Sequence, residues 1–92
     1  MIKDFKHKGL ETFFTKGTTK GIQSTHANKL RMQLAMLNVA EVISDMDKPG
    51  WQLHELKGNR KHIWSIKVSG NWRLTFQFEN GDAHIVNYED YH

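Results

Sequence analysis

The sequence contains no cysteine, which excludes disulfide bonds, thiolate zinc sites and a cysteine nucleophile. A chain without cysteine fits a reducing compartment, and we expect a cytoplasmic protein. Long apolar runs are also missing. None approaches the roughly 20 residues that a membrane-spanning helix needs, and the first residues, MIKDFKHKG, lack the apolar region of a signal peptide. We therefore expect no association with a membrane.

Several common catalytic signatures are missing as well. The sequence has neither a glycine-rich phosphate loop nor a serine nucleophile elbow. Its six histidines form no His-Glu-x-x-His motif and no close pairing with carboxylates at the spacing of metal ligands. We expect neither a metal ion nor any other cofactor.

The size and the charge of the chain limit its organisation and its partners. With 92 residues there is room for one hydrophobic core, so we expect a single domain over residues 1–92. Hydrophobic residues make up 38% of the chain, which is enough for such a core. The formal net charge is +3 at pH 7, and a basic chain favours a polyanionic partner.

The first half of the chain has the periodicity of helices. Leu10, Phe13 and Phe14 have the i, i+3, i+4 spacing of an amphipathic helix, which Gly17 is expected to end. A longer helix is predicted over residues 25–46, with Ser24 or Thr25 as its cap. Its apolar stripe is typical of a buried core, and it consists of Leu30, Leu34 and Leu37, flanked by Ala27, Met36, Val39, Ala40 and Ile43.

After Pro49 and Gly50, the hydrophobic period changes to two, which is typical of strands. The predicted strands cover residues 51–58, 64–68, 72–78 and 83–88. The dipeptide Asn80-Gly81 predicts a tight hairpin turn, because both residues tolerate a positive φ. The fold class is therefore α+β, with two N-terminal helices packed on a small antiparallel β-sheet.

The apolar pattern also predicts the strand register. A two-residue turn at positions 80–81 places Phe78 opposite Ala83, and an unbroken ladder then places Arg73 opposite Tyr88. The residues with the parity of Tyr88, which share the exposed face with Arg73, are Asp90 and His92. A three-residue loop over residues 69–71 implies three further pairs: Ile66 with Leu74, Lys67 with Arg73, and Val68 with Trp72. The helices should cover the face that carries Trp64, Ile66, Val68, Trp72, Leu74, Phe76 and Phe78.

The opposite face of the predicted sheet carries groups suited to cutting RNA. RNA can be cleaved with its own 2′-hydroxyl as nucleophile, which requires a base, an acid for the leaving 5′-oxygen, and cations for the developing charge. Histidine suits either proton role, arginine binds phosphate with several donors, and a tyrosine ring stacks on an unpaired base. The candidate catalytic residues are His54, Arg73, Asp90 and His92, with Tyr91 or Tyr88 alongside them. The candidate RNA-binding residues are Lys57, Arg60, Lys61, Lys67 and Arg73.

Four stretches of the chain resemble the HigB toxins of bacterial type II toxin–antitoxin pairs, within the wider RelE/ParE group. They are MIKDFKHKGLETFF, LHELKGNR, WSIKVSGNWRLTFQF and NYEDYH, and they run nearly end to end. The most specific parts are Gly58-Asn59-Arg60, Trp64-Ser65-Ile66, Asn71-Trp72-Arg73 and Asp90-Tyr91-His92. The resemblance implies a RelE/ParE-like fold of the α+β class that the periodicity also predicts.

The resemblance further implies an mRNA interferase, an endoribonuclease that enters the A site of the 70S ribosome and cuts the mRNA there. It implies a cognate helix-turn-helix antitoxin (HigA-like), and a toxin–antitoxin complex that binds its own operator DNA. Asp90 and His92 would share the acid–base work with help from His54. The remaining roles would fall to Arg73 and Lys57, which hold the phosphate, and to Tyr91, which positions a base or the backbone. Which residue is the general base stays open.

Two other classes of function remain alternatives. One is a non-enzymatic poison of DNA gyrase, as in the ParE branch, which would not need the acid–base groups near the end of the chain. The other is a nucleic-acid-binding or ribosome-binding module without catalysis, for which a solvated basic face would be sufficient.

Overall fold

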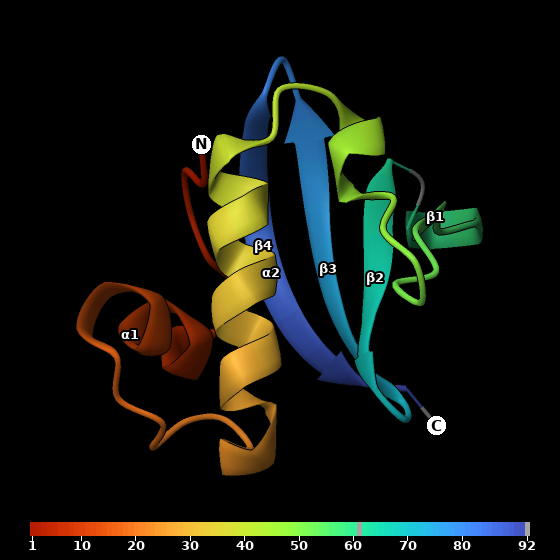
Figure 1. Cartoon of the computed structure of the whole chain (residues 1–92). Helices are drawn as coiled ribbons and strands as arrows, with labels where there is room; N and C mark the ends of the chain where they lie inside the picture. The colour runs from red at the N-terminus through yellow and green to blue at the C-terminus, as the bar shows by residue number, and fades with distance from the viewer. Residues whose placement is uncertain (61, 92) are drawn as a thin grey trace.

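The computed structural model describes residues 1–60 and 62–91. Within these ranges the chain forms two α-helices, three short 3₁₀ turns and a four-stranded antiparallel sheet of order β1-β2-β3-β4 (Figure 1). In chain order they are α1 (Lys8–Lys16), η1 (Ser24–His26), α2 (Ala27–Val39), η2 (Ile43–Met46), β1 (His54–Glu55), η3 (Gly58–Arg60), β2 (Ile63–Ser69), β3 (Trp72–Glu79) and β4 (Asp82–Asp90). The predicted α+β class is confirmed.

The hydrophobic core lies between α2 and one face of the sheet (Figure 1). The predicted stripe on α2 is confirmed, because Leu30, Leu34 and Leu37 are all fully buried. Their neighbour Gln33 is buried too, and its Nε2 donates a hydrogen bond to the backbone oxygen of Lys67 on β2 over 2.9 Å. The sheet contributes alternate residues to this core, among them Ile66, Val68, Leu74 and Phe76.

Helix α1 begins and ends at identifiable caps. The Nδ1 atom of His7 accepts a hydrogen bond from the N–H of Leu10 over 2.9 Å, so this histidine serves as the N-cap. Gly17 ends the helix in the left-handed region, with φ of 80°, as the sequence predicts. Leu10 and Phe13 are buried, whereas Phe14 lies at the surface.

Helix α2 is shorter than the sequence predicts. It ends at Val39, whose side chain is exposed, and not at Met46. The carboxylate of Asp45 accepts hydrogen bonds from the N–H groups of Glu41 and Val42, which gives the backbone an alternative to a continued helix. The expected capping by Ser24 or Thr25 is also wrong, since the turn η1 leads into α2 without a side-chain cap.

The hairpin between β2 and β3 largely follows the predicted register. Ile66 pairs with Leu74 and Lys67 pairs with Arg73, as expected. The predicted pair of Val68 with Trp72 is wrong, because the register shifts after Lys67 and Ser69 takes the place opposite Trp72. The strand predicted over residues 51–58 is confirmed only in part, as the short edge strand β1, which pairs with β2.

The hairpin between β3 and β4 contains a β-bulge that the sequence does not predict. Phe78 pairs with Ala83 as expected, but the register shifts between Gln77 and Thr75. Arg73 therefore pairs with Glu89, and the predicted pair of Arg73 with Tyr88 is wrong. As a consequence, the side chain of Tyr88 is buried in the core.

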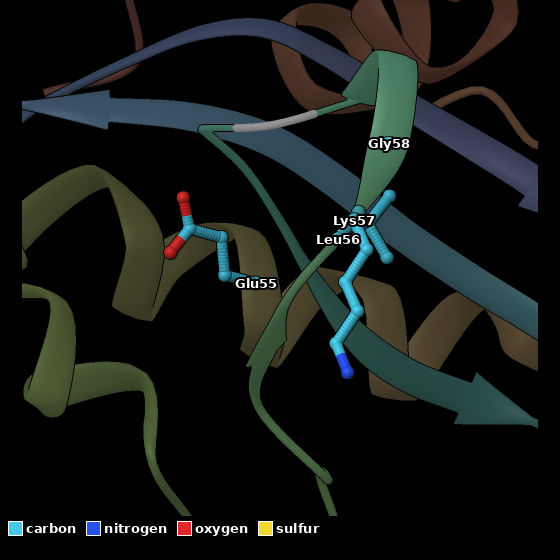
Figure 2. A pocket seen from close by; sticks show the side chains of 4 residues that line it. All are labelled: Glu55, Leu56, Lys57 and Gly58. Carbon is cyan, nitrogen blue, oxygen red and sulfur yellow. The ribbon is translucent and has the colours of Figure 1, made fainter.

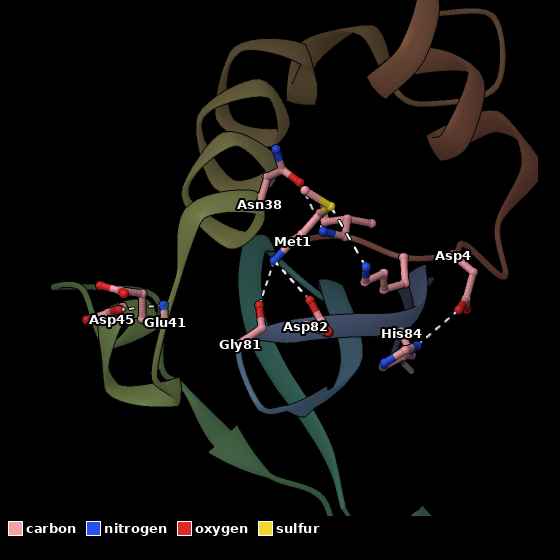
Figure 3. A network of polar contacts seen from close by, with 10 residues as sticks. Met1, Asp4, Asn38, Glu41, Asp45, Gly81, Asp82 and His84 are labelled. Carbon is pink, nitrogen blue, oxygen red and sulfur yellow. Dashed lines mark hydrogen bonds and ion pairs between the residues drawn. The ribbon is translucent and has the colours of Figure 1, made fainter.

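Ile85 lies in the bulge and has a φ of 47°, which is rare for a β-branched residue. The carboxylate of Asp4 accepts a hydrogen bond from the backbone N–H of Ile85. It accepts a second one from Nδ1 of His84 (Figure 3). Asp4 belongs to an N-terminal segment that lies along β4, with parallel bridges from Ile2 to Ala83 and from Phe5 to Val86. The start of the chain thus supports the bulge in its last strand.

Candidate functional site

The face of the sheet that points away from α2, called the outer face below, carries a row of three charged residues. Lys67 on β2 pairs with Arg73 on β3, and Arg73 pairs with Glu89 on β4. Side chains alternate along a strand, and the neighbours Ile66, Leu74 and Tyr88 are buried in the core. The bulge in β4 places Glu89 in this row, since an unbroken ladder would have placed Tyr88 there.

Glu89 forms the centre of a hydrogen-bonded cluster on the outer face. Its two carboxylate oxygens accept hydrogen bonds from Arg60, with Nη1–Oε1 and Nη2–Oε2 distances of 3.0 and 2.5 Å. Thr75, which is buried, donates its hydroxyl to Oε2 over 2.5 Å. Burial raises the pKa of Glu89, but the bonds from Arg60 and Thr75 outweigh it, so the net pKa is lowered.

Tyr91 lies at the edge of the same cluster. Its backbone N–H donates to the oxygen of Asn71 over 2.9 Å, and its hydroxyl accepts a hydrogen bond from Nη1 of Arg60 over 3.2 Å. The guanidinium carbon of Arg60 lies 5.8 Å from the ring centroid. Burial raises the pKa of the phenol, and the positive charges of Arg60 and Arg73 oppose this shift. Tyr91 thus contacts Arg60 directly, and its backbone is anchored to the β2–β3 turn.

Arg73 keeps most of its hydrogen-bonding capacity. Its Nη1 donates to the backbone oxygens of Gly70 and Trp72, at 2.7 and 3.1 Å, which fixes the side chain against the β2–β3 hairpin. Among the described residues, no carboxylate lies within ion-pair distance of its guanidinium. Arginine has five N–H donors, so the remaining ones are available to a bound phosphate.

His54 lies on the edge strand β1, exposed and opposite Ser65. This pairing makes it a diagonal neighbour of Lys67 on the outer face. The Nδ1 atom of His54 lies 2.9 Å from the backbone oxygen of Gln52. A carbonyl oxygen only accepts, so Nδ1 carries the proton and Nε2 of the neutral ring is left as the acceptor.

Lys57 follows β1 and helps to line a surface pocket with Glu55, Leu56 and Gly58 (Figure 2). Figure 2 shows its ammonium group and the carboxylate of Glu55 pointing in different directions. Glu55 instead accepts a hydrogen bond from the N–H of His62 over 3.0 Å. The structure therefore places Lys57 in the connection between β1 and η3.

The register corrects the expected position of Asp90. It pairs with Trp72 and has the parity of Tyr88, so it does not share a face with Arg73 as predicted. Its negative charge contributes to the raised pKa of Tyr88, after the larger effect of burial. The predictions for Lys61 and His92 lie outside the described residues.

Glu89 is the functional candidate that the sequence does not reveal. It lies inside NYEDYH, but an unbroken ladder directs it towards the helices. The only signal for its true orientation is the bulge, and Ile85 gives no hint of one because isoleucine favours regular strands. In the described part of the chain, no group of three or more His, Asp or Glu side chains is placed to hold a metal ion. No helix there is long and apolar enough to cross a membrane.

The fold and the outer face define a small α+β protein with a basic surface suited to a polyanionic ligand. The chain belongs to the HigB-like toxin family, since the family model for the RelE-like toxin of the type II toxin–antitoxin system HigB matches residues 3–92. Endoribonuclease HigB of Proteus vulgaris is 49% identical over 92 residues, which cover 100% of both chains. Toxin HigB-1 of Vibrio cholerae serotype O1 (strain ATCC 39315 / El Tor Inaba N16961) is 36% identical over 94 residues, covering 100% of this chain and 98% of that protein. The resemblance seen in the sequence is confirmed, and as a toxin of a type II system the protein pairs with an antitoxin.

Proposed function

We propose that this HigB-like toxin is an endoribonuclease that cleaves mRNA in the A site of the ribosome and so inhibits translation. Its full-length similarity to a protein named Endoribonuclease HigB supports the activity. The single structural observation that carries the proposal is Arg73, a guanidinium fixed on the outer face with unused donors and bound to the same β2–β3 turn as Tyr91. This arrangement suits a phosphate next to an unpaired base.

The proposed chemistry combines Arg73 of the outer face with proton-transfer groups that the sequence singles out. A base removes the proton of the ribose 2′-hydroxyl, and the oxygen attacks the adjacent phosphorus. The bond from phosphorus to the 5′-oxygen breaks as an acid protonates the leaving oxygen, which yields a 2′,3′-cyclic phosphate and a 5′-hydroxyl. His54, Asp90 and His92 carry these proton transfers, and Nε2 of His54 is the nitrogen able to accept one. Arg73 stabilises the negative charge that develops on the phosphate.

The basic residues around this centre bind RNA. Lys67 adjoins Arg73 in the sheet, and Lys57 lies in the connection between β1 and η3. We include Lys61, which follows Arg60 in the sequence, among the RNA-binding residues on its charge alone. Lysine supplies a point charge for phosphates of the mRNA or of ribosomal RNA. No metal ion or other cofactor takes part in this scheme.

We extend the proposal to the biological partners expected of a type II toxin. A cognate antitoxin with a helix-turn-helix domain neutralises the toxin, and their complex binds operator DNA through the antitoxin. The toxin acts in the cytoplasm, where translating ribosomes present the substrate.

The test is in vitro translation of a defined message, followed by primer extension to map the RNA ends. The wild-type toxin should give cuts in phase with codons, and only when ribosomes are present. The double variant Asp90→Asn, His92→Gln should lose this cleavage, because each proton-transfer group contributes about 10²–10⁴ in rate. Undiminished cutting by a folded double variant would overturn the catalytic assignment. DNA breaks without RNA cuts would instead identify a gyrase poison.

A further inference from the structure

Arg60 is held on the outer face by a carboxylate, although its charge alone suggests a phosphate ligand. Both of its terminal nitrogens donate to Glu89, whose side chain is 21% exposed. An exposed ion pair alone is weak evidence for a role. Here, however, the pair is bidentate, and Thr75 binds the same carboxylate from a buried position. The cluster therefore fixes the guanidinium in one place.

The geometry also connects this pair to Tyr91. Nη1 of Arg60 is shared between Oε1 of Glu89, at 3.0 Å, and the hydroxyl of Tyr91, at 3.2 Å. Tyr91 lies just beyond the end of β4, so its ring has no partner strand to orient it. Among the described residues, Arg60 is the one that hydrogen-bonds to the phenol.

We propose that Glu89 and Arg60 are positioning residues for Tyr91, with Glu89 fixing Arg60 and Arg60 fixing the phenol. Arg60 then does not bind a substrate phosphate, because its terminal nitrogens are engaged by Glu89. The value of an oriented Tyr91 for cleavage rests on the proposed function. The orientation itself is a property of the free protein.

Tyrosine titration tests the orientation without any substrate. The chain has two tyrosines, so in a Tyr88→Phe background the ¹³Cζ signal of labelled tyrosine reports Tyr91 alone. Removing the positive charge with Arg60→Ala should raise the pKa of Tyr91, whereas removing the negative charge with Glu89→Gln should lower it. The matched control is Arg31→Ala on α2, where an exposed arginine bonds to Asn28 and should leave the titration unchanged.

Cleavage of ribosome-bound mRNA then separates positioning from binding. Glu89→Gln and Arg60→Ala should lower the single-turnover rate constant by about 10- to 100-fold, since misplacing a group by about 1 Å has such effects. The toxin concentration at half-maximal rate and its salt dependence should stay unchanged. Arg60→Lys keeps the charge but not the bidentate geometry, and it should recover only part of the rate.

Two results would overturn the inference. One is a pKa of Tyr91 that neither Arg60→Ala nor Glu89→Gln changes. Arg60→Lys, the variant least disruptive to the fold, is titrated alongside them. The other result concerns cleavage by Arg60→Ala. If this variant binds mRNA-loaded ribosomes more weakly and with a smaller salt dependence, but cleaves at an unchanged single-turnover rate, Arg60 is a phosphate ligand. If the titrations shift as expected but the wild-type toxin does not cut mRNA, the proposed function fails and the positioning by Arg60 stands.

Discussion

The carboxylate of Asp4 accepts a hydrogen bond from the backbone N–H of Ile85, with 2.6 Å between oxygen and nitrogen. That N–H belongs to the bulge in β4, so Asp4 supports a conformation that the isoleucine itself disfavours. A slip of one residue in a strand turns every later side chain to the other face. The contact near the start of the chain therefore helps to decide that Glu89 and Tyr91 face outwards and Tyr88 inwards.

The first prediction concerns this contact. Asp4→Ala removes both acceptors and should reduce cleavage by up to about 10²-fold, because it loosens the position of Glu89 and Tyr91. Asp4→Asn is the matched control, since its amide oxygen can still accept from Ile85 and should preserve most of the activity. Backbone NMR shifts of β4 check the structural cause. Unchanged shifts at Glu89 in Asp4→Ala, together with normal cleavage, would show that the bulge is stable without Asp4.

The second prediction compares the two tyrosines. Tyr88 is buried, stacks on Trp72 with 4.4 Å between ring centroids, and has its hydroxyl 2.6 Å from Nδ1 of His26. Tyr88→Phe should therefore lower the free energy of unfolding by about 1 kcal/mol and leave cleavage unchanged. Tyr91→Phe should do the reverse, with a loss in cleavage of about 10-fold or more and little change in stability. Urea unfolding and the cleavage assay measure the two effects. If Tyr88→Phe lost cleavage and Tyr91→Phe lost stability, the register of β4 would be wrong.

The third prediction concerns the salt dependence of ribosome binding. Lys67→Gln and Arg73→Gln each remove a charge from the outer face, so the toxin should bind ribosomes more weakly. Each lost phosphate contact should reduce the slope of log K against log salt by about 0.7. Lys20→Gln, an exposed change in the connection between α1 and α2, is the control and should leave the slope unaltered. Equal slopes for all three variants would argue against phosphate contacts on the outer face.

The fourth prediction uses the lowered pKa of Glu89. Because the hydrogen bonds from Arg60 and Thr75 outweigh the effect of burial, the carboxylate binds its proton less readily in the folded state. Its contribution to stability is therefore present above the ordinary glutamate pKa of about 4.3 and is lost as the pH falls through the lower folded value. The difference in unfolding free energy between wild type and Glu89→Gln should shrink as the solution is acidified.

Denaturant titrations between neutral and acidic pH measure this difference. Glu41→Gln is the control, because Glu41 is exposed and forms no ion pair with the described residues. If the difference in unfolding free energy between wild type and Glu89→Gln stayed constant down to about pH 3, the hydrogen bonds from Arg60 and Thr75 would not stabilise the charged form of Glu89.

Local patterns in the sequence were sufficient for much of the fold. The core stripe of α2 and the pairing of Phe78 with Ala83 depend on spacing and on a two-residue turn, which neighbouring residues determine. The end of α2 was predicted wrongly because the side chain of Asp45 turns the backbone earlier than the apolar pattern suggests. The register of β4 was predicted wrongly for a different reason, since a residue far away in the chain supports the bulge at Ile85.

In the candidate site, too, local contacts were predicted correctly and long-range contacts were not. Lys67 and Arg73 were placed together correctly, because their hairpin is local. The grouping of Arg60 with Glu89 depends on a loop that reaches a strand 29 residues later, and no periodicity reports such a contact. Residue types thus indicated the chemistry, whereas long-range contacts decided which side chains meet.

The contact between Asp4 and Ile85 joins residues that are 81 positions apart in the sequence. Closing so long a loop costs chain entropy before the contact can form. We therefore expect the register of β4 to be set late in folding, after the local hairpin between β2 and β3 has formed.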